Sequence, residues 1–205
     1  MRRLALSLAI GLSALATGCG RGDDQTVSSN SGGGLCGRPG LAGQVIGPVS
    51  NPVAGCGSSH AIRLEAVGAI RLSQSATMDC PTARALETWV TKSAVTEVGR
   101  MGGGLSGLRV VAHYACRTRN NRPGARISEH GRGKAIDIAA LQLRDGSEIS
   151  VLSDWGQGPR GRVLRQTHRG ACGPFGTVLG PKSDRHHQDH FHFDTASHRG
   201  GPYCR

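Results

Sequence analysis

The nine residues HHQDHFHFD, at positions 186–194, contain four histidines and two aspartates, whereas the whole chain of 205 residues has only nine histidines. Imidazole and carboxylate groups are the ordinary ligands of metal ions and the ordinary acids and bases of catalysis. Side chains alternate between the two faces of a β-strand, so HFHFD predicts His190 and His192 on one face and Phe191 and Phe193 on the other. The apolar face can join a core while both imidazoles approach one centre. Two exposed strand histidines are the alternative interpretation.

A second candidate lies upstream, in the segment SEHGRGKAIDI at residues 128–138. His130 precedes a bend at Gly131 and Gly133, and the apolar residues after the bend predict a strand that contains Asp137. The bend can bring His130 and Asp137 to one point. An unpaired carboxylate in a buried strand costs on the order of a few kcal/mol. A cation or a hydrogen-bond network should therefore satisfy Asp137.

His130, Asp137 and one histidine of the HxH pair would supply two nitrogen ligands and one oxygen ligand. Three protein ligands with a fourth position open for water are typical of catalytic zinc rather than structural zinc. Zinc polarises a carbonyl group and activates a bound water, and a neighbouring base is needed to move the proton. The other histidine of the pair is well placed for that task. These residues therefore predict a zinc-dependent hydrolase.

The N-terminus predicts export. Two arginines precede an apolar run at residues 4–16, which is too short for a membrane-spanning helix and typical of a secretory signal. The run ends in LATGC, which resembles a bacterial lipoprotein processing site with Cys19 as the lipid-bearing first residue. We expect a signal peptide at 1–18, a flexible Gly/Ser-rich tether at 19–34 and one domain at 35–205. Ordinary secretory cleavage with a free Cys19 is the alternative.

The net charge of +11 suits an anionic surface, and export makes nucleic acid an improbable partner. Lipid headgroups and a carboxylate-bearing wall polymer are the polyanions that remain, although basic charge can also serve solubility alone. Gly20 follows Cys19, so the aspartate that would retain a lipoprotein in the inner membrane is missing, and we expect an outer-membrane anchor on the periplasmic side.

The remaining cysteines predict three disulfides in an oxidising compartment. They are Cys36, Cys56, Cys80, Cys116, Cys172 and Cys204. We expect Cys36 to pair with Cys56, Cys80 with Cys116, and Cys172 with Cys204. A Cys-ligated zinc site is disfavoured because the chain has no CxxC spacing.

The periodicity of apolar residues predicts an α+β domain with a small, largely antiparallel sheet and flanking helices. Residues 35–56, rich in Gly and Pro, indicate an irregular arm clipped by its two cysteines. Helices are expected at 81–99 and 163–171. Strands are expected at 107–116, 134–139, 148–152, 177–179 and 191–194.

Several stretches together resemble the bacterial extensin-like C-terminal domain family. They are CRTRN (116–120), SEHGRGKAID (128–137), ACGPFGTVLGP (171–181), HQDHFHFD (187–194) and the closing YCR. That family in turn resembles the zinc peptidases that include penicillin-insensitive murein endopeptidases and D-alanyl-D-alanine peptidases, through HxxxxxxD and HxH. The resemblance implies the fold that these peptidases share with hedgehog proteins.

Carried over to this chain, the resemblance implies zinc ligands His130, Asp137 and His192, with His190 as the base or transition-state stabiliser. His187 would lie at the rim and hydrogen-bond substrate; a loop histidine without a task is the alternative.

The same resemblance implies that Arg117 holds a substrate carboxylate or carbonyl and that Ser128 donates to substrate, although a turn-stabilising hydroxyl is an equal alternative for Ser128. Glu129 is expected in solvent. Trp155 could line the cleft or join the core, and His60, His113, His168 and His198 are expected at the surface or in the core.

The expected function is a lipid-anchored zinc hydrolase that cleaves an amide bond in peptidoglycan peptides. The D-alanyl-D-alanine enzymes use a Glu shortly before their last histidine ligand, and this chain offers only Asp184, Asp189 and histidines there. That favours endopeptidase chemistry with a histidine base. A lipoprotein that binds peptidoglycan without cutting it is one alternative, and a disulfide-stapled domain without metal is another.

Overall fold

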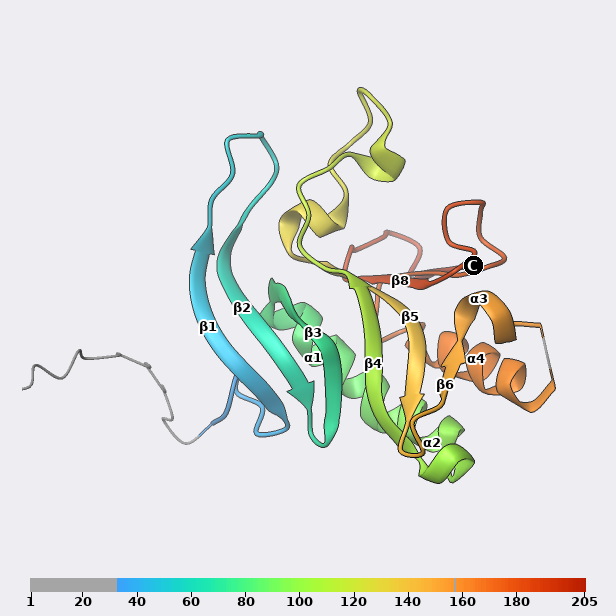
Figure 1. The fold of residues 1–205 in the computed structure, drawn as a ribbon. Coiled ribbons are helices and arrows are strands. Elements are labelled where there is room, and N and C mark those ends of the chain that lie inside the picture. The colour runs from blue at the N-terminus through green and yellow to red at the C-terminus, as the bar shows by residue number, and fades with distance from the viewer. Residues whose placement is uncertain (1–32, 157) are drawn as a thin grey trace, which may run out of the picture.

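The computed structural model describes residues 33–156 and 158–205 (Figure 1). The predicted signal peptide, Cys19 and all but the last two residues of the predicted tether lie outside the described residues. Within the described ranges, no helix is long and apolar enough to cross a bilayer.

The described strands form one nine-stranded sheet in the order β1-β2-β3-β4-β5-β8-β7-β9, with β6 paired to β5 (Figure 1). Their bounds are β1 Leu41–Val49, β2 Ser58–Val67, β3 Ile70–Asp79, β4 Leu105–Ala112, β5 Ala135–Leu143, β6 Glu148–Ser150, β7 Thr177–Leu179, β8 Phe191–Asp194 and β9 Tyr203–Cys204. Only β3–β4 and β7–β9 pair in parallel, so the sheet is mostly antiparallel. The α+β prediction is confirmed, but the sheet is larger than we expected.

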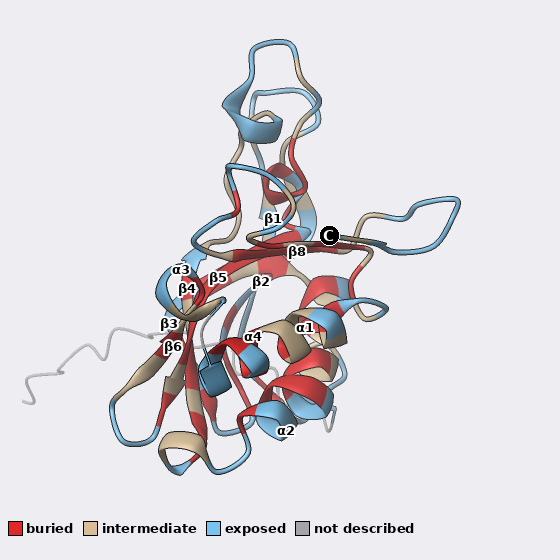
Figure 2. Cartoon of the chain, turned by 90° about the vertical axis from the view of Figure 1, so that its right-hand side faces the viewer, coloured by how far each residue is buried: buried red, intermediate tan, exposed pale blue. Residues whose placement is uncertain are grey.

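The helices cover one face of this sheet (Figure 2). They are α1 Cys80–Trp89, α2 Val95–Val98, α3 Val151–Asp154 and α4 Gly158–Ala171, with a π turn at Val90–Ala94 between α1 and α2. α1 begins because the Asp79 side chain accepts a hydrogen bond from the Thr82 amide at 2.9 Å, and α2 ends at Gly99, whose φ is 55°. The helix predicted at 81–99 is therefore confirmed, with a π turn inside it.

The core lies between these helices and the sheet. The Trp89 ring packs edge-on against Phe193 of β8 at 5.1 Å, and its Nε1–H donates to the Thr167 carbonyl of α4 at 2.8 Å. Phe191 and Phe193 are both fully buried, which confirms the apolar face predicted for HFHFD. The burial of that face anchors β8 and so fixes the orientation of its opposite face, which carries His192.

Several expected elements differ from the structure. The strand expected at 134–139 is β5, which runs on to Leu143, and the helix expected at 163–171 is α4, which begins at Gly158. Residues 35–56 are not simply an irregular arm, because β1 pairs with β2 through its backbone. β4 ends at Ala112 rather than at Cys116, since the His113 carbonyl leaves the ladder and accepts a hydrogen bond from His130. The strand expected at 148–152 turns into α3 at Val151, where the Asp154 side chain accepts from the Ser150 amide at 2.8 Å.

The three disulfides join Cys36 to Cys80, Cys56 to Cys116 and Cys172 to Cys204. The prediction of three bonds and the third pair are confirmed. The pairs Cys36–Cys56 and Cys80–Cys116 were wrong. The segment before β1 packs along α1, where the Arg84 guanidinium donates to the Cys36 carbonyl at 3.2 Å and Arg38 pairs with Glu87, so Cys36 reaches Cys80 at the start of that helix.

Candidate metal centre

Three elements that are distant in sequence carry the predicted ligands. His130 lies on the short 3-10 helix η4, Glu129–Arg132, while Asp137 lies on β5 and His192 on β8. Asp137 and His192 are direct partners in the antiparallel ladder, so the sheet itself places their side chains together. Gly133, with φ 69°, ends η4 and turns the chain into β5.

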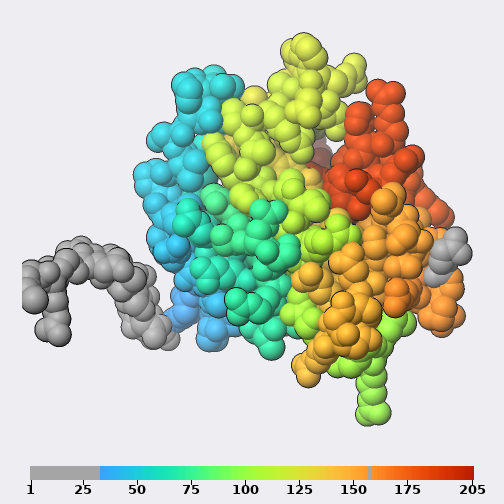
Figure 3. Space-filling view, in the orientation of Figure 1, coloured from blue at the N-terminus to red at the C-terminus, as the bar shows by residue number. Residues whose placement is uncertain are grey.

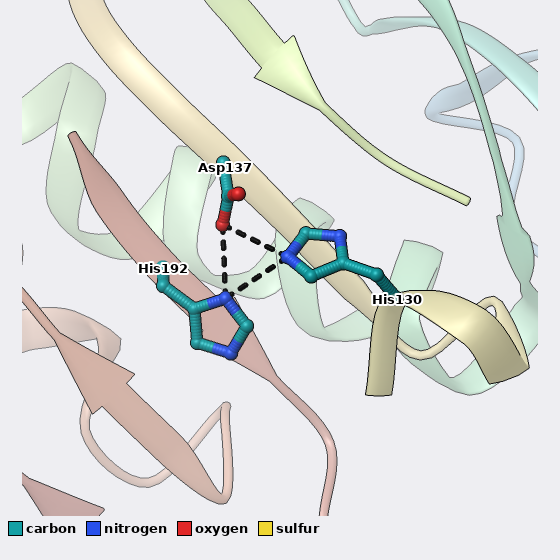
Figure 4. A group of neighbouring side chains, drawn as sticks. All are labelled: His130, Asp137 and His192. Atoms are coloured by element: carbon teal, nitrogen blue, oxygen red, sulfur yellow. Dashed lines mark hydrogen bonds and ion pairs between the residues drawn. The ribbon is translucent and has the colours of Figure 1, made fainter. Parts of the chain in front are cut away.

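The three side chains meet at one point (Figure 4). His130 Nε2 lies 3.1 Å from Asp137 Oδ1 and 3.1 Å from His192 Nδ1, and His192 Nδ1 lies 2.9 Å from Asp137 Oδ1. All three residues are buried, His130 completely. The bend that we predicted after His130 does bring it back to Asp137.

Each ligand histidine makes a further hydrogen bond through the ring nitrogen that faces away from the cluster. This bond indicates which of its two nitrogens carries a hydrogen. His130 Nδ1 lies 2.7 Å from the His113 carbonyl, and His192 Nε2 lies 3.0 Å from Asp194 Oδ2. Both partners only accept hydrogen bonds, so these two nitrogens are the donors. In the neutral rings His130 Nε2 and His192 Nδ1 then present lone pairs. Two lone pairs and a carboxylate oxygen then face one another, an arrangement that a proton or a metal ion would satisfy.

The dimensions and chemistry of this triangle suit zinc. A tetrahedral zinc ion with bonds of about 2.0–2.1 Å holds neighbouring ligand atoms about 3.3 Å apart. The three ligand atoms are 2.9 to 3.1 Å apart, so small movements would accommodate the ion. Outer hydrogen bonds from ligand histidines to a carbonyl and a carboxylate are also the usual support of zinc ligands.

The pKa values of the cluster follow from the same contacts. Burial acts to raise the pKa of Asp137, but hydrogen bonds and charges from His130 and His192 outweigh it and hold that pKa well below its ordinary value. Burial acts to lower the pKa of His192, but Asp137 and Asp194 outweigh it and raise the pKa to about 9. Without a metal, a proton on His192 is therefore the cation that the cluster retains at neutral pH.

His190 lies beside the cluster. Its Nδ1 donates to the Asp189 carboxylate at 2.7 Å, which leaves Nε2 as a lone pair 3.7 Å from Asp137 Oδ2. His187 makes the same kind of contact with Asp184 at 2.8 Å, and its ring lies 5.3 Å from the His190 ring. Burial lowers the pKa of His187 despite Asp184. The structure thus brings both predicted catalytic histidines to the cluster.

The cluster lies on a cleft of about 410 Å³. Figure 3 shows the hollow between the segment that follows β4, residues 113–128, and the C-terminal segment. Arg117 and Ser128 both line it, held together by a hydrogen bond of 2.9 Å from the Ser128 amide to the Arg117 carbonyl. The Ser128 side chain makes no capping bond to η4, so its hydroxyl is available to the cleft.

Comparison with known proteins identifies the family. The model of the extensin-like protein C-terminus family matches residues 43–205, which is most of the chain. The chain belongs to this family. No protein with a curated description and no solved structure matches it. The family predicted from the sequence motifs is therefore confirmed, and the link to zinc peptidases stays a prediction.

Sequence reasoning missed several residues that line the cleft of the extensin-like domain, among them Asp194, Thr177 and His198. Asp194 had no predicted role, although the alternation that groups His190 with His192 also places residue 194 on that face. His198 lines the cleft, and the sequence carries no motif that could have revealed it.

Glu129 was expected in solvent, and that was wrong. It is buried, with Oε1 3.1 Å from Arg132 and 3.7 Å from Arg119, so two arginines compensate its charge. Trp155 packs against His168 and Phe191 and thus belongs to the core rather than the cleft.

Proposed function

We propose that this extensin-like domain is a zinc-dependent hydrolase that cleaves an amide bond in the peptides of peptidoglycan. One observation carries the proposal: His130 Nε2, Asp137 Oδ1 and His192 Nδ1 converge as three electron-pair donors beside a cleft that Asp137 and His192 line. A buried site of this kind is costly to maintain without a cation. Its position on a cleft suits catalysis better than structural support.

Zinc held by these three side chains would polarise a substrate carbonyl and make a water molecule a stronger nucleophile at neutral pH. His190 then acts as the base. Asp189 fixes its Nδ1–H, so Nε2 is the atom that accepts a proton from the attacking water and returns it to the leaving amine. His187, whose pKa burial keeps low, serves as a neutral hydrogen-bonding group beside it.

Arg117 and Ser128 position the substrate in this proposal. A guanidinium group binds a carboxylate through two parallel hydrogen bonds, and peptidoglycan peptides carry free carboxylates. The choice of peptidoglycan rests on the resemblance of the HxxxxxxD and HxH motifs to murein endopeptidases. The proposed location is the periplasmic face of the envelope, where a lipid on Cys19 would anchor the domain to the outer membrane.

The experiment combines metal analysis with digestion of purified muropeptides. Wild-type protein should hold about one zinc ion per chain and release new products. His190→Ala should keep the zinc and lose activity by about 10²- to 10⁴-fold, the range for a general base. His60→Ala provides the matched control, because His60 is exposed, bonds only its neighbour Ser59 and lies outside the cleft.

Two other outcomes would reject the proposal. Zinc-loaded wild type that binds muropeptides but leaves them intact would favour a binding role for the domain. Protein without zinc, in which His130→Ala changes neither metal content nor digestion, would favour a structural domain held by its disulfides.

A further inference from the structure

We infer that Asp194, Thr177 and His198 form a hydrogen-bonded series that positions His192 for metal binding and extends from the cluster to the protein surface. The inference rests on the proposed function and assigns roles to three residues for which the sequence motifs predicted none. It concerns one hydrogen bond of the candidate metal centre, the bond that His192 makes through Nε2, the ring nitrogen that faces away from the cluster.

Asp194 is the central member of the series. Its Oδ2 accepts from His192 Nε2 at 3.0 Å, and its Oδ1 accepts from the Ala196 amide at 2.9 Å. Asp194 is buried, so this carboxylate has little water to compete for its lone pairs. The contacts on both oxygens fix the plane of the carboxylate and, through it, the orientation of the His192 ring.

Thr177 and His198 extend the contact. Thr177 lies directly opposite Asp194 in the β7–β8 ladder, and its hydroxyl oxygen lies 3.0 Å from His198 Nε2. A hydroxyl can donate to the carboxylate and accept from the imidazole at the same time. His198 is exposed and lines the cleft, so the series runs from the buried ligand to a group that substrate can reach.

The fold holds the members of the series in place independently of the metal. Thr177 on β7 and Asp194 on β8 are direct partners in the antiparallel ladder. His198 lies in the segment between β8 and β9, and the disulfide from Cys172 to Cys204 holds the end of that segment. The contact to His192 is thus built by the backbone, as expected for a positioning group.

The consequence for His192 is specific. While Asp194 accepts from Nε2–H, the lone pair of the neutral ring stays on Nδ1, which faces Asp137 and His130. Without that acceptor, the ring can place its hydrogen on Nδ1 or rotate away from the cluster. Loss of such an outer partner usually weakens metal binding by about 10- to 100-fold.

The test measures zinc affinity by competition with a chromophoric chelator, using the whole exported domain. Asp194→Asn keeps the size of the side chain and removes its charge, and it should weaken zinc binding by about 10- to 100-fold. Thr177→Val and His198→Ala should each weaken it by a smaller, several-fold factor. Asp145→Asn is the charge-matched control, since Asp145 lies in an exposed turn, bonded to Ser147.

A second readout separates positioning from general stability. In cobalt-loaded protein, Asp194→Asn should change the visible absorption of the metal, whereas a merely structural residue would leave that spectrum as in wild type. Asp194→Glu, which restores the charge, should recover part of the affinity. If Asp194→Asn does not fold, Thr177→Val carries the same two measurements, because it leaves Asp194 in place.

Zinc affinity and cobalt spectrum equal to wild type in both Asp194→Asn and Thr177→Val would overturn the inference while the proposed function stands. Unchanged affinity in Thr177→Val and His198→Ala, with loss only in Asp194→Asn, would overturn the extension beyond Asp194. Wild type that binds no zinc would overturn the proposed function and this inference together.

Discussion

Cys56 lies directly behind Gly131, the residue that follows the predicted metal ligand His130: a β-carbon on Gly131 would come within 3.1 Å of the Cys56 sulfur. The bond from Cys56 to Cys116 therefore supports the turn that carries the ligand. The same turn is tied to the segment before Cys116, where the Ala115 amide donates to the His130 carbonyl at 3.2 Å.

We predict that the double variant Cys56→Ser/Cys116→Ser loses zinc affinity by about tenfold or more, because His130 is then held less rigidly. The control is Cys36→Ser/Cys80→Ser, which opens a bond of similar sequence separation, 44 residues against 60. Both variants should lose roughly 2–4 kcal/mol of stability. Chelator competition at a temperature where both are folded should show the affinity loss only in the first. Equal affinities would contradict this role of the Cys56–Cys116 bond.

The pH dependence of stability should differ between metal-free and zinc-loaded protein. The pKa of His192 is raised from 6.5 to about 9, so its proton stabilises the metal-free fold fully below pH 6.5, and this stabilisation is lost as the pH rises through 9. Zinc replaces that proton and gains affinity over the same range. Melting temperatures with EDTA should fall between pH 6.5 and 9, while those with zinc should change less. A constant difference between the two series would contradict the account.

Substrate binding should depend on the shape of the Arg117 side chain as well as its charge. Arg117→Lys keeps the charge but removes the planar fork, so KM for a muropeptide should rise by about tenfold with little change in kcat. Arg126→Lys is the matched control, because Arg126 lies in the same segment after β4, residues 113–128, and does not line the cleft. Steady-state kinetics of both variants measure this effect. Equal KM values for Arg117→Lys and Arg126→Lys would show that Arg117 does not bind substrate.

The apolar face of β8 should contribute strongly to stability. Phe193 is fully buried between Trp89 and Phe175, so Phe193→Ala should lower the free energy of unfolding by about 3–5 kcal/mol. Val111→Ala, at a position that is 47% exposed, should change it by about 0.5 kcal/mol or less. Urea unfolding with intact disulfides measures both. A small effect at Phe193 would mean that β8 is not held by its core face.

The sequence predicts the elements of the candidate metal centre better than the rest of the fold. Alternation in HFHFD indicates which face of the strand joins the apolar core, and β7 and β8 appear at the predicted bounds. Asp137 could be recognised because a carboxylate between two buried isoleucines needs a partner. These signals are local, and local signals are what a single sequence contains.

The features that the sequence did not reveal depend on contacts between distant segments. β1 is an edge strand with mostly exposed residues, so it shows no apolar alternation and forms only because β2 lies beside it. The pairing of Cys36 with Cys80 follows from the packing of the segment before β1 along α1, not from spacing along the chain. The outer hydrogen bond from His130 to the His113 carbonyl is a backbone contact, and no residue type signals it.

Anomalous diffraction at the zinc edge, from crystals of protein purified without chelator, tests the central claim most directly. The account predicts one peak, about 2.0–2.1 Å from each of His130 Nε2, Asp137 Oδ1 and His192 Nδ1. No peak at that position after zinc soaking, with the two imidazoles and the carboxylate instead bridged by hydrogen bonds, would contradict it.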